Sequence, residues 1–461
     1  MKHYDVVVIG SGPAGQKAAI QAAKAGQKVA LVERDKMLGG ACVHRGTIPS
    51  KTLRENAQRI RNLRKNAALF NWELSEDTEM TTLITRLDQV LHAHDHYMRE
   101  QIERNGIEVI HGRARFVTAT ELDIVKVRGE PERLSATHTV IATGSIPRHP
   151  PDIPIDHENI FDSDSILSML YLPKSLIVLG GGVIASEYAS IFQALGVKVT
   201  MIDKYPKPLG FLDQDLSAAF VTTLESMGGT WLGETVVKSV VYDGISEVIV
   251  TCEDGLKVRG QKLLCAAGRI ANIKDLQIEN AGLSLNERGL ISVNEHLQTA
   301  VPNIYAAGDI IGPPALASTS MEQGRRASLN ALGMSTLGLP NTIPFGIYGV
   351  PELASVGLTE KQAREKHGDI LIGRAPFSEI ARGHISGNED GMLKLVCDGK
   401  GEHILGVHII GENATELVHL GQLAMTAGMT VDSFLDNIFN FPTLAEAYRV
   451  AAFDVISKRP A

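Results

Sequence analysis

Apolar runs and a helical pattern alternate at the start of the chain. Tyr4–Ile9 is an almost continuous apolar run, which is typical of a short strand buried on both faces. A helical pattern over Gly15–Ala25 and a second apolar run over Lys28–Glu33 follow it. Together, the three segments predict one strand–helix–strand unit of about 30 residues.

The same pattern returns near the middle of the chain. Ser175–Leu179 predicts a strand, Gly180–Leu195 a helix, and Lys198–Asp203 a second strand. The first glycines of the two units, Gly10 and Gly180, lie 170 positions apart. One repetition at that distance indicates a duplicated nucleotide-binding unit rather than a short-period solenoid.

The segments between and after these units have other patterns. Thr52–Asn105 is polar with a helical pattern, whereas Val109–Ala142 and Val236–Cys265 are typical of strands and turns. The Pro-rich stretch Pro147–Pro154 predicts a domain boundary. Residues 342–461 carry no nucleotide fingerprint, and we expect a third domain there. A length of 461 residues agrees with about three domains.

Composition narrows the class of protein. Hydrophobic residues make up 44% of the chain and charged residues 21%, which excludes a disordered chain and a collagen. The net charge of −8 argues against a nucleic-acid partner, which a basic surface would attract. No apolar run reaches the roughly 18 residues of a membrane-spanning helix, so we expect no membrane partner.

The N-terminus and the cysteines indicate a compartment. The chain opens directly with a strand pattern and shows no secretory signal pattern. No pair among its four cysteines, Cys42, Cys252, Cys265 and Cys397, has metal-ligand or CxxC spacing. The sequence therefore predicts no metal site, no disulfide scaffold and a cytoplasmic location.

A glycine-rich loop follows the first predicted strand. Gly10-Ser11-Gly12-Pro13-Ala14-Gly15 has the GxGxxG spacing, and Glu33 ends the next strand. Such glycines permit a tight turn, backbone approach to a pyrophosphate and close helix packing. The terminal carboxylate suits the hydroxyls of an adenosine ribose. The sequence predicts a dinucleotide site, with a plain strand–helix turn as the alternative.

The second unit repeats this arrangement as Gly180-Gly181-Gly182-Val183-Ile184-Ala185. Asp203 follows Gly180 by 23 positions, as Glu33 follows Gly10. Two dinucleotide sites in one chain indicate an oxidoreductase with a resident flavin and an exchangeable nicotinamide. The alternative is a degenerate copy that has lost its ligand.

Four segments carry a resemblance to a known family. They are Gly39–Lys51 (GGACVHRGTIPSK), Ala142–Gly144, Gly268–Arg269 and Ala306–Asp309. With them the whole chain resembles the flavin-dependent pyridine nucleotide–disulfide oxidoreductases. The resemblance implies an α/β fold with two Rossmann-like dinucleotide-binding domains and a C-terminal α+β dimerisation domain. The implied domains are 1–149 with 270–341 for FAD, 150–269 for NAD(P), and 342–461 for dimerisation.

Two departures from that family concern its redox chemistry. The family has a redox disulfide in a CxxxxC motif. Only the first of its two cysteines is present here, as Cys42, because Thr47 occupies the second position. The family's His-Pro-Thr is Phe441-Pro442-Thr443 here, and phenylalanine cannot exchange a proton. This double loss resembles the transhydrogenase branch, in which one nicotinamide nucleotide reduces the flavin and a second one takes the hydride. FAD, NAD(H) and NADP(H) are the implied cofactor and substrates.

The motifs and the resemblance together imply a set of site residues. Lys51, Glu187, Thr47 and Cys42 are expected in the catalytic flavin environment, with Lys51 near flavin N5 and paired with Glu187. The residues expected to bind the cofactors are Gly10, Gly12, Pro13, Ala14, Gly15, Glu33, Arg34, Gly40, Ala41, Cys42, Gly46, Thr47, Lys51, Ala114, Thr143, Gly144, Gly180, Gly182, Val183, Ile184, Glu187, Asp203, Lys204, Gly268, Arg269, Gly308, Asp309 and Ala317.

The resemblance also implies a homodimer, with the possibility of a larger homo-oligomer. Phe441 would reach the partner's flavin site across the interface, and Tyr448 and Arg449 would lie on an interface helix. A helix opening around Ala317 would point its N-terminus at the flavin. Cys42 has two interpretations, a reactive thiol near the flavin or a small packed residue, of which the second is favoured.

The sequence does not decide whether the second site accepts NADP(H) as well as NAD(H), so more than one activity stays open at this point. Asp203 suits the 2′-hydroxyl of NAD, and its charge opposes the 2′-phosphate of NADP, although Lys204 and Lys207 are near in sequence. The first hypothesis is a flavin-dependent transhydrogenase. The alternatives are an NADH-specific diaphorase, quinone reductase or oxidase, and a non-catalytic flavin-bound dimer.

Overall fold

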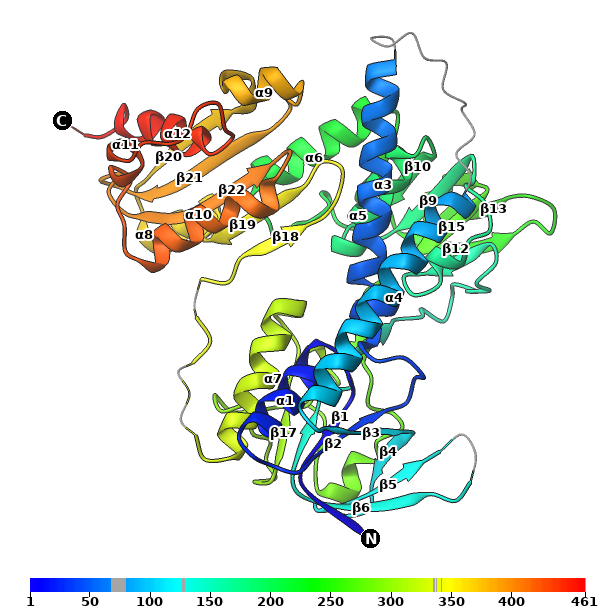
Figure 1. The fold of residues 1–461 in the computed structure, drawn as a ribbon. Helices are drawn as coiled ribbons and strands as arrows, with labels where there is room; N and C mark the ends of the chain where they lie inside the picture. The colour runs from blue at the N-terminus through cyan, green and yellow to red at the C-terminus, as the bar shows by residue number, and fades with distance from the viewer. Residues whose placement is uncertain (68–79, 127–128, 335, 337, 341, 461) are drawn as a thin grey trace.

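We describe the protein from a computed structural model of residues 1–461, leaving out residues 68–79, 127–128, 335, 337, 341 and 461 (Figure 1). Its first sheet has seven strands, in the order β3-β2-β1-β6-β5-β4 with β17 paired to β6. The strands β2, β6 and β17 extend the sheet in parallel from β1, and β5 and β4 add an antiparallel edge. The bounds are β1 Lys2–Ile9, β2 Val29–Glu33, β3 Glu108–His111, β4 Arg113–Phe116, β5 Glu121–Val125, β6 Glu132–Ile141 and β17 Ile304–Ala306.

The continuous apolar run of β1 has a direct cause in its packing. Tyr4, Val7 and Ile9 belong to the core on one face of the first sheet. Val6 and Val8 belong to the core on the other face, with α1 (Pro13–Lys24) and α7 (Ala317–Ala331). Both faces of this strand are therefore buried.

The helices α1 and α7 cross at very short range. A Cβ atom on Gly324 of α7 would lie 1.9 Å from the carbonyl oxygen of Ala14 in α1. Only glycine permits this approach, which brings the N-termini of both helices to the same end of the sheet.

The second sheet is entirely parallel, in the order β11-β10-β9-β15-β8. An antiparallel three-stranded sheet, β12-β13-β14, lies beside it, and the short pair β7 and β16 connects the two parts of the chain. The bounds are β7 Ser145–Pro147, β8 Ile160–Asp162, β9 Ser175–Leu179, β10 Lys198–Ile202, β11 Thr230–Leu232, β12 Val237–Tyr242, β13 Val248–Cys252, β14 Lys257–Gly260, β15 Lys262–Cys265 and β16 Arg269–Ala271.

Helices connect the two sheets. The first sheet leads through α2 (Gly40–His44) into the long α3 (Thr47–Asn66), and α4 (Met80–Arg104) returns to it. The helix α5 (Val183–Ala194) covers the second sheet and packs against α3 near the middle of the molecule (Figure 1). The helix α6 (Gln214–Ser226) belongs to the same unit.

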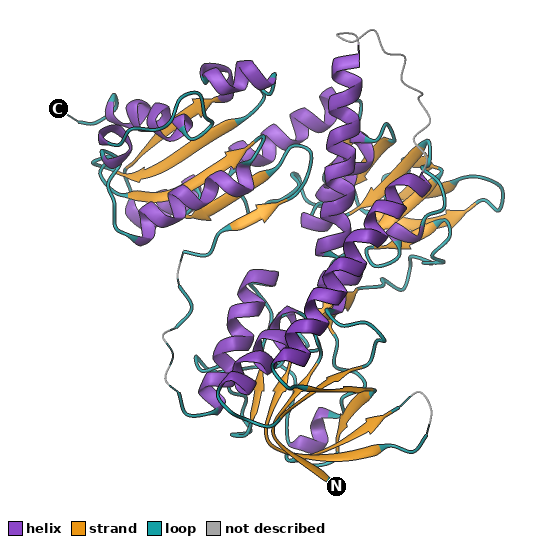
Figure 2. Ribbon diagram, in the orientation of Figure 1, coloured by secondary structure: helices purple, strands orange, loops and turns teal. Residues whose placement is uncertain are grey.

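The C-terminal sheet is antiparallel, in the order β18-β19-β22-β21-β20. Figure 2 shows the helices gathered around it, and the hydroxyl of Tyr448 in α12 donates to the carbonyl of Leu417 in α10, 2.7 Å away. The bounds are β18 Phe345–Ile347, β19 Leu353–Gly357, α8 Glu360–His367, β20 Ile370–Pro376, α9 Ala381–Ser386, β21 Met392–Asp398, β22 Ile404–Ile410, α10 Ala414–Thr426, α11 Ser433–Asp436 and α12 Glu446–Ile456.

The predicted fold class is confirmed, with local differences. The first helix begins at Pro13, two residues before the expected start, because proline fits the first helical turn after Gly12. In the second unit the helix begins only at Val183, since the glycines before it form the loop. Tyr448 lies on the helix α12 as expected, and its side chain is fully buried within its own chain, while the place of that helix at an interface stays a prediction.

No helix among the described residues is both long and apolar enough to cross a membrane.

The core of the second sheet includes Leu53 of α3 and Ile347 of β18. This shared core fixes the second sheet, α3 and the start of the C-terminal sheet against one another.

Candidate functional site

A cavity of about 690 Å³ lies where the ends of the first sheet meet α3, α5 and the strand β18. Most of the residues singled out from the sequence line it. They are Gly10, Gly12, Pro13, Ala14, Glu33, Arg34, Gly40, Ala41, Cys42, Gly46, Thr47, Lys51, Ala114, Thr143, Gly144, Val183, Ile184, Glu187, Arg269, Gly308, Asp309 and Ala317. The residues outside its wall are Gly15, Gly180, Gly182, Asp203, Lys204 and Gly268.

The first glycine loop forms one end of this cavity. Gly10 has a φ of 100°, and a Cβ on Gly15 would lie 1.7 Å from the carbonyl oxygen of Gly10. Gly15 therefore acts beneath the loop by letting α1 approach β1. No side chain caps the N-terminus of α1, so its backbone N–H groups are free to meet an anion.

Glu33 is held firmly at the end of β2. Its Oε2 accepts hydrogen bonds from the amide and the hydroxyl of Ser11, at 2.9 and 2.6 Å, and its Oε1 accepts one from the amide of Asp35 at 2.9 Å. The carboxylate is buried but borders the cavity. Its remaining lone pairs suit the hydroxyl groups of a ribose.

The predicted pair of Lys51 and Glu187 is present. The Nζ atom of Lys51 in α3 lies 2.8 and 2.9 Å from the two carboxylate oxygens of Glu187 in α5. The Glu187 side chain is 5% exposed and that of Lys51 is 26% exposed, so the pair is partly shielded from water. This geometry fixes a positive charge at the wall of the cavity.

Cys42 lies on α2 near the start of α3, where Thr47 is the first residue. Burial raises the pKa of the Cys42 thiol, although a hydrogen bond with Thr47 and the charge of Lys51 act in the opposite direction. Cys42 is a free cysteine. A protonated thiol is a poor nucleophile, which favours the packed interpretation of Cys42 over the reactive one.

A chain of polar contacts crosses the far side of the cavity. The hydroxyl of Ser145 donates to Asp309 at 2.7 Å and accepts from Nε of Arg269 at 2.9 Å. Nη1 of Arg269 in turn donates to Asp164 at 2.9 Å. The contacts thus link the first sheet to the loop after β8.

The N-terminus of α7 borders the cavity at Ala317, the residue at which the sequence predicts a helix to open. No side chain caps it, and no acidic residue lies in its first turn. Its positive dipole end therefore favours a group that gains negative charge.

The glycines of the second loop, Gly180–Gly182, lie outside the wall of this cavity, directly after β9, the central strand of the second sheet. Oδ1 of Asp203 accepts a hydrogen bond from the amide of Tyr205 at 3.0 Å, and a Cβ on Gly181 would lie 3.1 Å from Oδ2. Lys204 and Lys207 are exposed. The indole Nε1 of Trp231 donates to the carbonyl of Pro206 at 3.0 Å and closes one side of the loop.

The lining residues that were not singled out from the sequence include Ser145, Asp164 and Tyr348. Ser145 directly follows the Ala142–Gly144 motif, which was a usable signal. Tyr348 comes from a segment without a motif, and only the packing of distant elements brings Asp164 and Tyr348 to the cavity.

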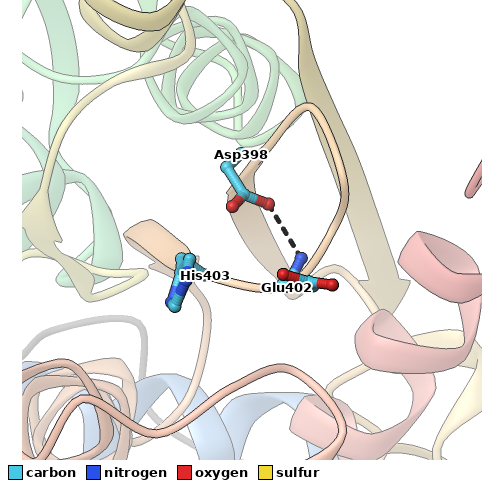
Figure 3. A group of neighbouring side chains, drawn as sticks. All are labelled: Asp398, Glu402 and His403. Atoms are coloured by element: carbon cyan, nitrogen blue, oxygen red, sulfur yellow. Dashed lines mark hydrogen bonds between the residues drawn. The ribbon is translucent and has the colours of Figure 1, made fainter.

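Among the residues that the structure describes, one group has metal-ligand spacing outside the cavity. Asp398, Glu402 and His403 each offer a ligand atom within 4.8 Å of the others, on the turn between β21 and β22 (Figure 3). Oδ1 of Asp398 accepts a hydrogen bond from the amide of Glu402 at 2.8 Å. This contact accounts for the turn, and we assign no metal to it.

The fold and the cavity agree with the sequence relationships of the chain. Residues 4–324 match the pyridine nucleotide-disulphide oxidoreductase family, and residues 343–452 match the dimerisation domain of the same family. The chain therefore belongs to the pyridine nucleotide-disulphide oxidoreductase family.

Within that family, curated relatives point to one branch. Proteins named soluble pyridine nucleotide transhydrogenase, from Mycobacterium tuberculosis and from Erwinia tasmaniensis, are each 41% identical to this chain. In both cases the similarity covers 99% of this chain and 98% of the relative.

Solved structures share the whole fold. The HOCl-induced flavoprotein disulfide reductase RclA from Escherichia coli is 29% identical, with a TM-score of 0.89 over 98% of this chain and 99% of its own. LpdA from Mycobacterium tuberculosis is 26% identical, with a TM-score of 0.90 over the same shares of the two chains.

Proposed function

We propose that this protein is an FAD-dependent pyridine nucleotide transhydrogenase, which moves a hydride between NAD(H) and NADP(H) without a redox disulfide. The observation that carries the proposal is that Thr47, and not a second cysteine, lines the cavity together with Cys42. The hydroxyl of Thr47 cannot form a disulfide with Cys42, so this position offers no dithiol to exchange electrons with a flavin. The names of the relatives at 41% identity support the same activity.

The residues of the cavity suit FAD. Nothing lies within 4 Å of a Cβ built on Gly12, so the loop backbone is open to a pyrophosphate. Glu33 would hold the ribose, and the N-termini of α1 and α7 would face the phosphates and the flavin ring. A volume of about 690 Å³ is in the range of cofactor sites. Bound flavin would supply the ability to accept a hydride and to release it.

Lys51 and Glu187 would act beside the flavin. The ammonium of Lys51 favours negative charge on the reduced ring, and the carboxylate of Glu187 holds the ammonium in place. Val183 and Ile184, at the start of α5, would border the nicotinamide. In this proposal, residues 1–149 and 270–341 form the FAD-binding domain, and residues 150–269 form the NAD(P)-binding domain.

The C-terminal residues 342–461 would form the interface of a homodimer. A larger homo-oligomer would consist of several such dimers. Phe441 is 69% exposed and does not line the cavity of its own chain. It is therefore available to the partner's flavin site, as the family resemblance implies. We propose a cytoplasmic location for the dimer.

Asp203 favours a second candidate, an NADH-specific diaphorase. Its carboxylate is fixed by the amide of Tyr205 at the end of β10, where it would meet the 2′-position of the nucleotide ribose. Lys204 and Lys207 are exposed nearby and would offset its charge toward a 2′-phosphate. The balance of these charges decides between the two candidates.

Anaerobic stopped-flow reduction of the FAD-loaded protein tests the proposal. NADH and NADPH are mixed in separately while flavin absorbance is followed, and NADPH is then offered together with thio-NAD⁺. We expect both nucleotides to bleach the flavin and thio-NAD⁺ to be reduced. Bleaching by NADH alone overturns the proposal in favour of the diaphorase, and no bleaching by either nucleotide indicates a non-catalytic protein.

A further inference from the structure

We infer that Tyr348 is a positioning residue for Lys51, whose ammonium it covers with the face of its ring. The residue lies within the part of the chain that matches the dimerisation domain, 343–452. That domain would thus contribute to the flavin site of its own chain as well as to an interface. The inference rests on the proposed function only in placing Lys51 beside a flavin.

The ammonium of Lys51 contacts an aromatic ring and a carboxylate. The Nζ atom lies 4.9 Å from the centroid of the Tyr348 ring, within the range of a cation–π interaction. It also meets both carboxylate oxygens of Glu187, at 2.8 and 2.9 Å. The ring and the carboxylate together leave the long lysine side chain few other positions.

Tyr348 is also tied to the partner of Lys51. Its backbone amide donates to Oε1 of Glu187 at 2.9 Å. One residue therefore orders both members of the ion pair, the cation through its ring and the carboxylate through its amide. Removing the ring leaves the amide contact in place, which separates the two effects experimentally.

The segment that carries the ring is fixed by two helices. The amide of Val350 donates to Oγ of Ser190 in α5 at 3.1 Å, and Nε of Arg54 in α3 donates to the carbonyl of Gly349 at 3.1 Å. Arg54 and Ser190 are both buried. The ring is thus placed by the same two helices that supply Lys51 and Glu187.

The hydroxyl of Tyr348 stays protonated. Burial raises the pKa of Tyr348, and the charges of Glu352, Glu187 and Glu416 add to the shift. The ring face, rather than a phenolate charge, is therefore what meets the ammonium. Phenylalanine offers the same face without the hydroxyl, and leucine offers a similar apolar volume without the face.

Sulfite affinity gives a readout that does not depend on turnover. Sulfite adds to oxidised flavins, and a fixed cation beside the ring stabilises the anionic product. A cation–π contact of this kind corresponds to roughly a 2- to 30-fold change in an equilibrium constant. We therefore expect Tyr348→Leu to raise the sulfite dissociation constant of the FAD-loaded protein within that range.

Tyr348→Phe is the matched control, and we expect it to keep the wild-type affinity for sulfite. A wild-type value in Tyr348→Leu, or an equal change in both variants, would overturn the inference. If Tyr348→Leu fails to fold, the unbranched variant Tyr348→Met takes its place in the comparison. FAD content is measured for each protein so that loss of cofactor is not mistaken for loss of affinity.

The Lys51→Met background separates positioning from a general structural role. If Tyr348 acts through the ammonium, Tyr348→Leu has no further effect on sulfite affinity once Lys51 is gone. Equal effects in both backgrounds would contradict positioning. These measurements use no NADP(H), so failure of the transhydrogenase proposal is seen separately, in the nucleotide experiment above.

Discussion

Single side chains decide which chemistry this cavity excludes. Cys42 has a hydroxyl rather than a thiol beside it, and burial raises its pKa, so the thiolate is disfavoured. In the sequence, Phe441 takes the position of the histidine in the family's His-Pro-Thr motif, and phenylalanine holds no exchangeable proton. The two positions act together, which leads to a prediction about restoring only one of them.

Thr47→Cys should not create a disulfide reductase. The new thiol lies next to Cys42, but proton transfer to and from the thiols remains unassisted, and such assistance contributes roughly 100-fold or more. We expect turnover of glutathione disulfide or lipoamide to stay at least about 100-fold below transhydrogenation. Steady-state assays with each disulfide measure this, with Thr47→Ser as the control that keeps the hydroxyl. Disulfide turnover comparable to transhydrogenation would refute the argument.

Asp203→Ala should shift nucleotide preference toward NADPH. Removing one carboxylate near the 2′-phosphate relieves a like-charge repulsion, and we expect the ratio of kcat/KM for NADPH over NADH to rise roughly tenfold. The matched control is Asp254→Ala, since Oδ1 of Asp254 likewise accepts an amide two residues on, from Leu256, but in a turn between β13 and β14. An unchanged ratio would mean that Asp203 does not face the ribose.

At the scale of elements, one buried cation joins the second unit to the C-terminal sheet. Lys394 of β21 is 1% exposed and lies 2.7 Å from Asp213, the N-cap of α6, and 2.9 Å from Asp215. It also lies 2.8 Å from Glu360, in the first turn of α8. Three elements therefore meet at this ammonium, and Arg374 of β20 pairs with Asp215 and Glu360 beside it.

The acidic groups around Lys394 have lowered pKa values. Burial alone would raise the pKa of Asp213, but hydrogen bonds from Lys394 and from the amide of Glu360 outweigh it. Burial likewise opposes the lowered pKa values of Asp215 and Glu360, and hydrogen bonds from Lys394 and from Arg374 or Arg364, respectively, outweigh it. A carboxylate with a lowered pKa stabilises the fold above its unfolded pKa, near 4, and this stability is lost as the pH falls through the folded value.

Lys394→Met should destabilise the protein strongly at neutral pH and less in acid. It leaves a buried carboxylate without its partner, which costs about 3 kcal/mol or more. We expect the difference in unfolding free energy from wild type to shrink as the pH falls from about 6 to below about 4, because the carboxylates become protonated. Urea unfolding at several pH values measures this difference.

Lys361→Met is the control, since Lys361 directly follows Glu360 in α8. The Lys361 side chain is 75% exposed and pairs only with Glu365, at 4.0 Å, so its removal should cost less than about 1 kcal/mol at every pH. A pH-independent difference for Lys394→Met would show that the ion pairs do not carry the effect.

At the scale of the whole molecule, the C-terminal part presents apolar side chains to solvent. Ile438 is 95% exposed, Phe441 69% and Leu423 of α10 66%. They lie within the match to the family's dimerisation domain. Their exposure on the part of the chain that matches a dimerisation domain agrees with the proposed homodimer.

Ile438→Glu should weaken that dimer. A carboxylate buried without a partner costs several kcal/mol, so we expect the dimer dissociation constant to rise at least about 100-fold. Sedimentation velocity over a range of concentrations measures it. Ile245→Glu is the control, since Ile245 is 84% exposed but lies between β12 and β13, outside the dimerisation match. Equal dissociation constants for wild type and Ile438→Glu would remove this surface from the interface.

Much of the fold and the site could be read from local pattern. The buried run Tyr4–Ile9 and the two glycine loops predict strand–helix units, because burial on both faces and glycine-dependent turns are local requirements. Thr47 and Phe441 exclude dithiol chemistry by their chemical nature alone. For Tyr448 the sequence predicts the helix, but only the packing of its own chain decides that its side chain is buried.

The sequence by itself determined the class of fold, the position of the glycine loops and the lack of a redox disulfide at Cys42. Only the tertiary structure decided that Lys51, Glu187 and Tyr348 meet, since they lie on α3, on α5 and after β18. It alone placed Lys394 among three acids. Local patterns follow from each segment's own burial and turns, whereas these contacts depend on how distant segments pack into a shared core.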